Sequence, residues 1–251
     1  MKLVLNHLTR MQSGYICVAG VDVQAKRHVR PIPARAHLRP ELLACHGGPF
    51  DLGVILDLGP TKYIGQPPQV EDHEFDLRQA KALGTLAAPR FWNMLTQMAQ
   101  PSLRAIFGAD LQKRGTNSCG VDVGKGSASL GCLIPQAAPD IYLRSRPEKP
   151  DQIRMRVTDG DFVLDLGVTD IRLYAADHAA PERSAVQAVQ ERLRRKEEVI
   201  LGVGLTRPFS PSPELVSPLH WVQVNNLHFK ADPLWPCKNV NSRASQKEGP
   251  S

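Results

Sequence analysis

The first forty residues of the chain combine strand-forming apolar residues with a concentration of positive charge. Seven basic side chains lie there: Lys2, Arg10, Lys26, Arg27, Arg30, Arg35 and Arg39. A single acid, Asp22, accompanies them, so the segment carries a charge of +6, which equals the formal net charge of the whole 251-residue protein. Cations set along a sheet can contact successive phosphates of a nucleic acid. The charge therefore indicates an anionic partner.

Four of these cations could follow one phosphate backbone. We expect Lys26, Arg27 and Arg30 in a hairpin turn and the start of its return strand, while Arg10 leads into the outgoing strand. Tyr15 lies nearby in the sequence and offers an aromatic face for a base. A solvated basic turn without a ligand is the alternative, and the concentration of net charge favours the ligand.

A second candidate surface lies in segment 220–235, which combines two tryptophans with histidine and asparagine side chains. Trp221 and Asn225 fall in a run that has roughly the pattern of a strand with one solvated face. On such a face an asparagine amide can recognise the edge of a base. The same residues would also suit buried tryptophan anchors with asparagine caps, and the sequence leaves both interpretations open.

Two other motifs lack the spacing that their chemistry needs. Gly120 and the pair Gly124-Lys125 have three residues between them, not the four of a P-loop, so we expect a glycine-rich turn in which Lys125 can still touch a phosphate. Segment 71–75 places three acids around His73, which could in principle hold a divalent ion for a nuclease. Such acidic segments are more typical of solvated turns.

No pattern assigns a catalytic residue, a metal ligand or a cofactor. His46, His73 and His178 lack HExxH or HxH spacing, and no Gly-x-Ser-x-Gly elbow is present. No pair of the five cysteines has CxxC spacing. We interpret the cysteines as reduced thiols, mostly buried in strands. The sequence therefore favours a protein without catalytic activity.

The composition is that of a globular protein built from short elements. Hydrophobic residues make up 42% and charged residues 22%, and 21 prolines favour short segments separated by turns. No apolar run is long enough to span a bilayer, and the N-terminus lacks the apolar stretch of a signal peptide. We therefore expect a cytoplasmic protein with no membrane partner. The polar residues 236–251 indicate a disordered tail.

Short runs rich in β-branched and aromatic residues predict strands. They are 15–23, 52–59, 161–167, 168–174, 199–205 and 220–226. Helices are fewer: a stretch over 75–99 broken at Pro89, a short turn capped by Ser102 and ended by Gly108, and a long helix over 181–198. The long helix carries one apolar stripe, made of Ala185, Val186, Val189 and Leu193.

Several ordered motifs resemble the bacterial dual OB-fold-containing domain family. They are HLTRM, ICVAGVD, RHVRPI, GGPFDLG, PPQVEDHEF, ASLGCL, VTDIRLY, VGLTRPF and HWVQVNNLHFKADPLW, and the resemblance covers residues 3–235. The resemblance implies two tandem OB-like barrels. We therefore expect a mainly β protein with inserted helices (α+β). A first OB-like barrel would occupy 1–110, a second barrel with one long helix 111–235, and the tail 236–251.

The same resemblance implies binding of nucleic acid or a nucleotide, and it links the chain to bacterial defence or conflict systems, with an effector protein as a possible partner. Our first hypothesis is a non-enzymatic module that binds or senses single-stranded nucleic acid. Its expected phosphate contacts are Arg10, Lys26, Arg27, Arg30 and Arg207, and its expected base contacts are Trp221 and Asn225. The alternative is a pocket for a small nucleotide or modified base, contacted by Arg207 and His220. A metal-dependent nuclease around Asp72 and His73 is less favoured.

Overall fold

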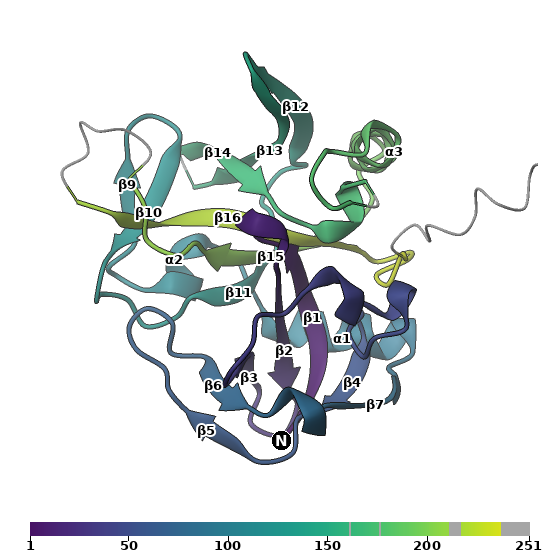
Figure 1. Cartoon of the computed structure of the whole chain (residues 1–251). Helices are drawn as coiled ribbons and strands as arrows, with labels where there is room; N and C mark the ends of the chain where they lie inside the picture. The colour runs from purple at the N-terminus through teal and green to yellow at the C-terminus, as the bar shows by residue number, and fades with distance from the viewer. Residues whose placement is uncertain (161, 176, 211–216, 237–251) are drawn as a thin grey trace, which may run out of the picture.

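The structure is a computed structural model that describes residues 1–160, 162–175, 177–210 and 217–236. The predicted tail therefore lies outside the described residues from position 237 onwards. Within the described ranges the chain is mainly β with inserted helices, as predicted. Its strands form two sheets, one of which curls into a half-barrel (Figure 1).

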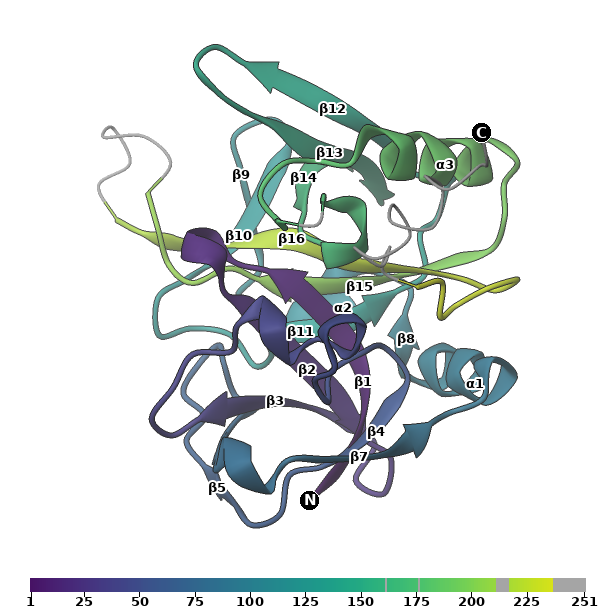
Figure 2. The ribbon, with the colours of Figure 1, turned by 45° about the vertical axis from the view of Figure 1, so that its right-hand side comes forward.

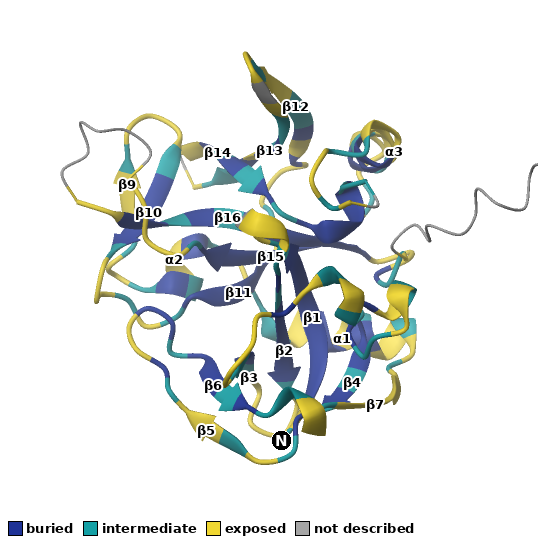
Figure 3. Cartoon of the chain, viewed as in Figure 1, coloured by how far each residue is buried: buried dark blue, intermediate teal, exposed yellow. Residues whose placement is uncertain are grey.

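The first sheet uses strands from residues 2–85 in the order β5-β6-β3-β2-β1-β4-β7. Their bounds are β1 (Lys2–Arg10), β2 (Ile16–Asp22), β3 (Arg27–Pro33), β4 (Val54–Asp57), β5 (Thr61–Tyr63), β6 (Asp72–Phe75) and β7 (Lys81–Thr85). The central strands β1 and β2 are mostly buried, and the edge strands β5 and β7 are mostly exposed (Figure 3). The parallel pairing of β6 with β3 sets Asp72 beside Arg30.

The second sheet has the order β12-β13-β14-β16-β15-β11-β8, and β10 with β9 joins it through β16. Bounds are β8 (Ala99–Gln100), β9 (Gln112–Arg114), β10 (Ser118–Asp122), β11 (Leu130–Leu133), β12 (Asp140–Arg146), β13 (Lys149–Asp159), β14 (Phe162–Val168), β15 (Val199–Leu205) and β16 (Leu219–Phe229). The change from one sheet to the other falls between Thr85 and Ala99, ahead of the predicted division at residue 110.

The helices are α1 (Ala88–Met98), α2 (Leu103–Phe107) and α3 (Arg183–Arg194). The predicted apolar stripe of α3 is buried in full, because it packs on the second sheet. The α2 prediction is confirmed too: the Ser102 hydroxyl accepts a hydrogen bond from the amide of Ala105 at 3.1 Å, and Gly108 ends the helix at φ 82°.

Two predicted elements are wrong. Residues 75–87 do not form an α-helix: the chain leaves β6, makes the short 3-10 turn Leu77–Gln79 and pairs β7 with β4 at the sheet edge. Pro89 therefore lies in the first turn of α1, where its missing N–H costs nothing, instead of interrupting a helix. Residues 168–174 are not a single strand, because β14 ends at Val168 and Asp170 caps the 3-10 turn Ile171–Leu173.

Apolar side chains form a core under each sheet and a third core between the sheets. The first core includes Leu3, Leu5 and Leu8 of β1, and Ile171 and Leu234 from far along the chain pack there too. The second core lies between its sheet and α3. The third core contains Val4, Val21, Phe91, Met94, Leu95, Cys132 and Ile200. It places α1 against both sheets, so neither sheet is covered by its own segment alone.

A β-bulge interrupts the central strand of each sheet. In β1 the register with β2 shifts between Leu5 and His7, and in the β15–β16 pair it shifts between Gly202 and Val203, opposite Asn225. Each bulge turns two consecutive polar residues towards the other sheet, Asn6 with His7 and Asn225 with Asn226. In Figures 1 and 2, β1 rises from the lower sheet to cross β16 at this place.

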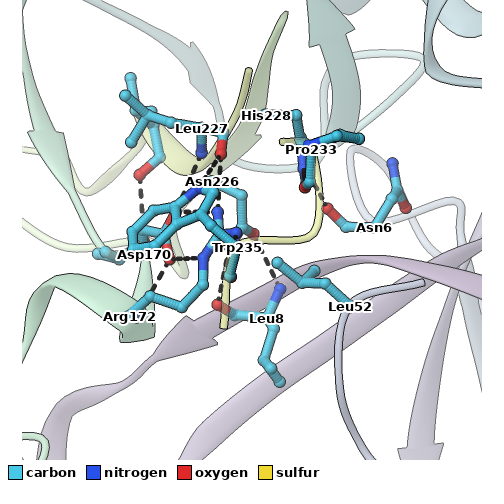
Figure 4. Close-up of polar contacts among 12 residues, drawn as sticks. Asn6, Leu8, Leu52, Asp170, Arg172, Asn226, Leu227, His228, Pro233 and Trp235 are labelled. Carbon is cyan, nitrogen blue, oxygen red and sulfur yellow. Dashed lines mark hydrogen bonds and ion pairs between the residues drawn. The ribbon is translucent and has the colours of Figure 1, made fainter. Parts of the chain in front are cut away.

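The two bulged strands are joined by side chains that replace missing backbone partners (Figure 4). The amide of Asn226 accepts a hydrogen bond from Leu8 N at 2.8 Å and donates one to Leu8 O at 3.1 Å, as a neighbouring strand would. His228 Nε2 lies 3.0 Å from the carbonyl oxygen of Asn6. β1 is thereby attached to β16 although the strands belong to different sheets.

A fully buried ion pair, Asp170–Arg172, lies beside this junction (Figure 4). Arg172 Nη2 and Nε donate to the two carboxylate oxygens at 2.6 and 2.9 Å, and Asp170 also accepts from Leu227 N at 3.0 Å. The remaining guanidinium donors reach Leu227 O and Trp235 O, while the Trp235 ring lies 3.8 Å from Arg172 Cζ. Both charges are therefore extensively hydrogen-bonded, which a buried pair requires.

We predict that Arg172→Met lowers the free energy of unfolding by about 3–5 kcal/mol, because it leaves the Asp170 carboxylate buried without its counter-charge. Chemical denaturation followed by circular dichroism measures this loss. The matched control is Arg183→Met, which removes an ion pair to Asp151 from an arginine side chain that is 71% exposed. That change should cost about 0–1 kcal/mol. Equal losses from the two variants would contradict the role given to the buried pair.

Candidate functional site

Between the sheets lies a layer of polar side chains that we call the polar seam: Asn6, His7, His28, Arg30, Asp72 and Asn225. All are buried except His28, which is half-buried. The bulges supply three of them, and the two-residue alternation of β3 turns His28 and Arg30 to the same face. On the neighbouring strand β15, a Cβ on Gly204 would come within 2.4 Å of the Asn225 amide nitrogen, so a larger residue there would displace the Asn225 side chain from the seam.

Asp72 lies between two guanidinium groups. Arg30 Nε donates to Asp72 Oδ1 at 2.6 Å, and both side chains are buried. Arg207 Nη2 lies 3.5 Å from Asp72 Oδ2, and the Arg207 side chain is 56% exposed. Arg30 Nη2 is buried without a hydrogen-bond partner. The pair thus presents one unused buried donor, and a second, more exposed arginine lies at the other oxygen of the same carboxylate.

The acidic segment 71–75 is not a solvated turn, so that expectation is wrong. Glu71, Asp72 and His73 are all buried. The Glu71 carboxylate accepts hydrogen bonds from Ser129 N and Oγ, both at 2.7 Å, and from Leu130 N at 3.1 Å. These bonds satisfy amides at the start of β11 and join the sheets. Since Asp72 is neutralised by two arginines, the segment offers little free negative charge for a divalent cation.

At the inner end of the seam, His7 and His28 approach Cys132 of β11. Burial lowers the pKa of His28 to about 4 and that of His7 well below its usual range, with the charge of His28 a further cause for His7. Burial raises the pKa of the Cys132 thiol to about 12. Both imidazoles are therefore neutral near pH 7, and the cysteine is a thiol.

At its outer end the seam reaches an exposed surface that we call the Phe209 rim: Lys125, Arg207, Phe209 and Trp221. Phe209 is 47% exposed, and its ring centroid lies 6.3 Å from that of the half-buried Trp221. The Trp221 indole donates to Phe209 O at 3.0 Å, which holds the two rings together. The rim lies at the start of β16 beside β10 (Figure 1).

Strand pairing brings Lys125 to the same rim. Phe209 forms a bridge with Leu219, which pairs with Asp122, the last residue of β10. Lys125 lies in the turn that follows, where its amide donates to Asp122 O at 3.1 Å, and its side chain is exposed. The predicted glycine-rich turn after Gly120 is thus present, and it supplies a surface cation.

The cations of the first forty residues do not form one group. Lys26 and Arg27 are exposed at the turn between β2 and β3, as predicted. Arg10 pairs with Ile16 at the other end of β2, which is about 20 Å from Arg27 at 3.3 Å per residue. The Arg10 guanidinium lies over the Tyr174 ring, 4.6 Å from its centroid.

Three predicted contact residues face the interior. Arg30 forms the buried pair described above. His220 is 2% exposed, with Nδ1 2.8 Å from Thr206 O and 2.9 Å from Gln69 Nε2. Asn225 is 4% exposed and contacts His7 and Gln223. The sequence did not single out Phe209 or the pair Asn6-His7, although two polar residues inside the apolar run of β1 are a signal for a bulge or a buried site.

No protein-family model matches this chain, and a search of curated proteins finds no relative. The expected kinship with dual OB-fold domains therefore stays a hypothesis based on its motifs. Among the described helices, none has the length and apolar character needed to cross a bilayer.

The buried histidines predict that the free energy of unfolding decreases as the pH is lowered. His228 is fully buried, and burial together with the nearby Arg172 charge lowers its pKa to about 4, whereas an unfolded histidine titrates near 6.5. The unfolded chain therefore binds more protons between these values. The contribution of neutral His228 to the free energy of unfolding is about 3 kcal/mol. It is fully present above pH 6.5 and is lost as the pH falls towards 4.

Denaturation at a series of pH values from 7.5 downwards measures this slope, and His228→Gln should flatten it. His37→Gln, at an exposed position, is the control and should keep the slope of the unmodified protein. An unfolding free energy that does not change over this range would contradict the burial of neutral histidines between the sheets.

Proposed function

We propose that the protein binds single-stranded nucleic acid at the Phe209 rim without catalysing a reaction. The observation that carries the proposal is an exposed aromatic ring held against a tryptophan, two residues from an exposed arginine, where the two sheets meet. Proteins that bind single strands combine aromatic faces, on which bases stack, with cations that follow the phosphates. Phe209 and Trp221 supply the stacking faces, and Arg207 and Lys125 the cations.

The burial of Asn225 and Arg30 changes the predicted assignment of roles. Both side chains are closed off from a ligand at the surface, so base contact rests on the rings, and sequence preference should be weak. Lys26 and Arg27 remain candidates for further phosphate contacts beyond the rim. The proposal keeps the OB-like fold, the cytoplasmic location and a role in bacterial defence with an effector protein as expectations from the resemblance.

A small nucleotide is the second candidate ligand, favoured by one observation. Arg30 Nη2 is a buried donor without a partner, and Arg207 lies on the other side of the same carboxylate. An unused guanidinium donor is suited to a phosphate oxygen. The nuclease hypothesis gains no such support, because the Asp72 oxygens already face Arg30 and Arg207, and His73 Nδ1 lies 2.9 Å from Glu71 O.

We predict that Phe209→Ala weakens binding of a fluorescent single-stranded oligonucleotide by about 1–3 kcal/mol, the contribution of one stacked base. Arg207→Gln should reduce the slope of log affinity against log salt by roughly 0.7, the value for one lost phosphate contact on a single strand. Fluorescence anisotropy at several salt concentrations measures both effects, with thermal denaturation to confirm that each variant is folded.

The matched control is a second exposed arginine beside an aromatic ring, Arg156 with Tyr142 on the neighbouring strands β13 and β12. Tyr142→Ala and Arg156→Gln should leave affinity and salt slope unchanged. If the control pair and the rim pair lose affinity equally, the binding is a diffuse attraction to a basic protein and the rim is not the site.

Ligand length separates the two candidate ligands. If the Phe209 rim binds a single strand, affinity should rise over a series from one to about ten nucleotides, because each added phosphate releases further counterions. A pocket for a small nucleotide should give full affinity with the mononucleotide and a shallow salt slope. Isothermal titration with the series therefore decides between them.

A further inference from the structure

We propose that His7, His28 and Cys132 form a binding site for a transition-metal ion of the Zn²⁺ class. One ligand atom from each of the three side chains lies within 4.8 Å of the others. His28 Nε2 and Cys132 Sγ are 3.8 Å apart. Two imidazole nitrogens and a thiolate are a donor set that zinc and its neighbours in the first transition series prefer, whereas calcium and magnesium prefer oxygen.

The spacing fits one ion with small adjustments. Zinc holds nitrogen at about 2.0–2.1 Å and sulfur at about 2.3 Å in a tetrahedron, so ligand atoms around it lie about 3.5 Å apart. The His28–Cys132 distance of 3.8 Å is already close to that value. The ring centroids of His7 and His28 are 5.3 Å apart with their planes at 69°, so their nitrogens can converge without stacking.

Unused polar atoms at the cluster provide a second, independent observation. His7 is 1% exposed, and its Nε2 has no hydrogen-bond partner. Asn6 is fully buried, and its Oδ1 has no partner either. A buried polar atom left without a partner costs about 1–3 kcal/mol. A bound ion would use the lone pair of the imidazole nitrogen and so remove this cost for His7.

Asn6 can supply a fourth ligand. Its amide nitrogen lies 3.2 Å from His28 Nε2 and 3.5 Å from Cys132 Sγ, so the amide already faces the cluster. With the amide turned over, the oxygen Oδ1 would occupy that position. A set of two nitrogens, one sulfur and one oxygen then surrounds the ion, with no open position required for a substrate.

Groups around the cluster are suited to hold it. Asn225 Nδ2 lies 3.3 Å from His7 Nδ1. With this amide turned over, its oxygen would accept from Nδ1–H while Nε2 binds the ion, and such a partner fixes the orientation of a metal-binding imidazole. Cys132 itself belongs to the apolar core between the sheets. His28 is half-buried, so one of the three ligand residues keeps partial contact with solvent.

The ion would join the two sheets. His7 and His28 come from β1 and β3 of the first sheet, and Cys132 from β11 of the second. On binding, the Cys132 thiol releases one proton and its sulfur becomes the thiolate ligand, while both imidazoles bind in their neutral form. The expected role is structural and independent of the Phe209 rim.

The experiment uses the full-length protein, stripped of metal with a chelator under reducing conditions and titrated with Co²⁺. One equivalent should bind and produce the near-ultraviolet charge-transfer band of a cobalt–thiolate bond. Zn²⁺ should displace the Co²⁺, abolish the band and raise the melting temperature. Cys132→Ser should abolish the band, and His28→Gln, at a half-buried position that tolerates change, should weaken binding by more than about 100-fold, beyond the usual effect of an outer-shell partner.

The matched control is Cys119→Ser, which changes another buried thiol whose pKa burial likewise raises to about 12. It lies in the second core, away from the histidines. This variant should bind Co²⁺ as the unmodified protein does. The proposal is overturned if the unmodified protein takes up no stoichiometric Co²⁺ or Zn²⁺, or if the charge-transfer band persists in Cys132→Ser.

Discussion

The fold depends on satisfying the polar groups that the two sheets bury against each other. Most sheet pairs meet through apolar side chains, but here β1 and β16 bring asparagine and histidine side chains to the contact. Asn226 serves the backbone of Leu8 as a neighbouring strand would, and His228 lies against the carbonyl of Asn6. Because each unsatisfied buried group is costly, the sheets are confined to the one arrangement in which these bonds form.

The Asp170–Arg172 pair and the polar seam differ in how fully their polar atoms are hydrogen-bonded. The pair has hydrogen-bond partners on both charged groups, so it fixes the turn after β14 against β16. The seam retains unused atoms on Asn6, His7 and Arg30. Buried groups that are left unsatisfied are uncommon and need an explanation. Among the described residues such atoms also occur on Arg10, Arg114 and His178, and those of the seam lie at the proposed metal site and beside Asp72. Their presence links the chemistry of the molecule to the contact between its sheets.

Much of the secondary structure could be predicted from local pattern. The β15 run, the α3 stripe and the Ser102 cap have strong local signals, and each is present as expected. The helix predicted over residues 75–85 is wrong because their side chains have helical preference, whereas pairing with β4 at the sheet edge determines their conformation. The seam could not be predicted, since a bulge reverses which residues face the partner sheet. Alternation along β16 therefore gave no means to assign Asn225 to the interior, and Arg30 became buried only through its long-range neighbour Asp72.

The attachment of β1 to β16 has a consequence for how the protein is made. The bond between Leu8 and Asn226 links residues 218 positions apart in the chain. Every strand of the first sheet has been synthesised once Thr85 is added, yet His7 and the backbone of Leu8 must wait for Asn225 and Asn226 before these partners exist. During that interval the first sheet exposes polar groups whose partners have not yet been synthesised. Long-range contacts of this kind slow folding and favour association with other chains. Synthesis of the last strand is thus the step that commits the whole molecule to its native state.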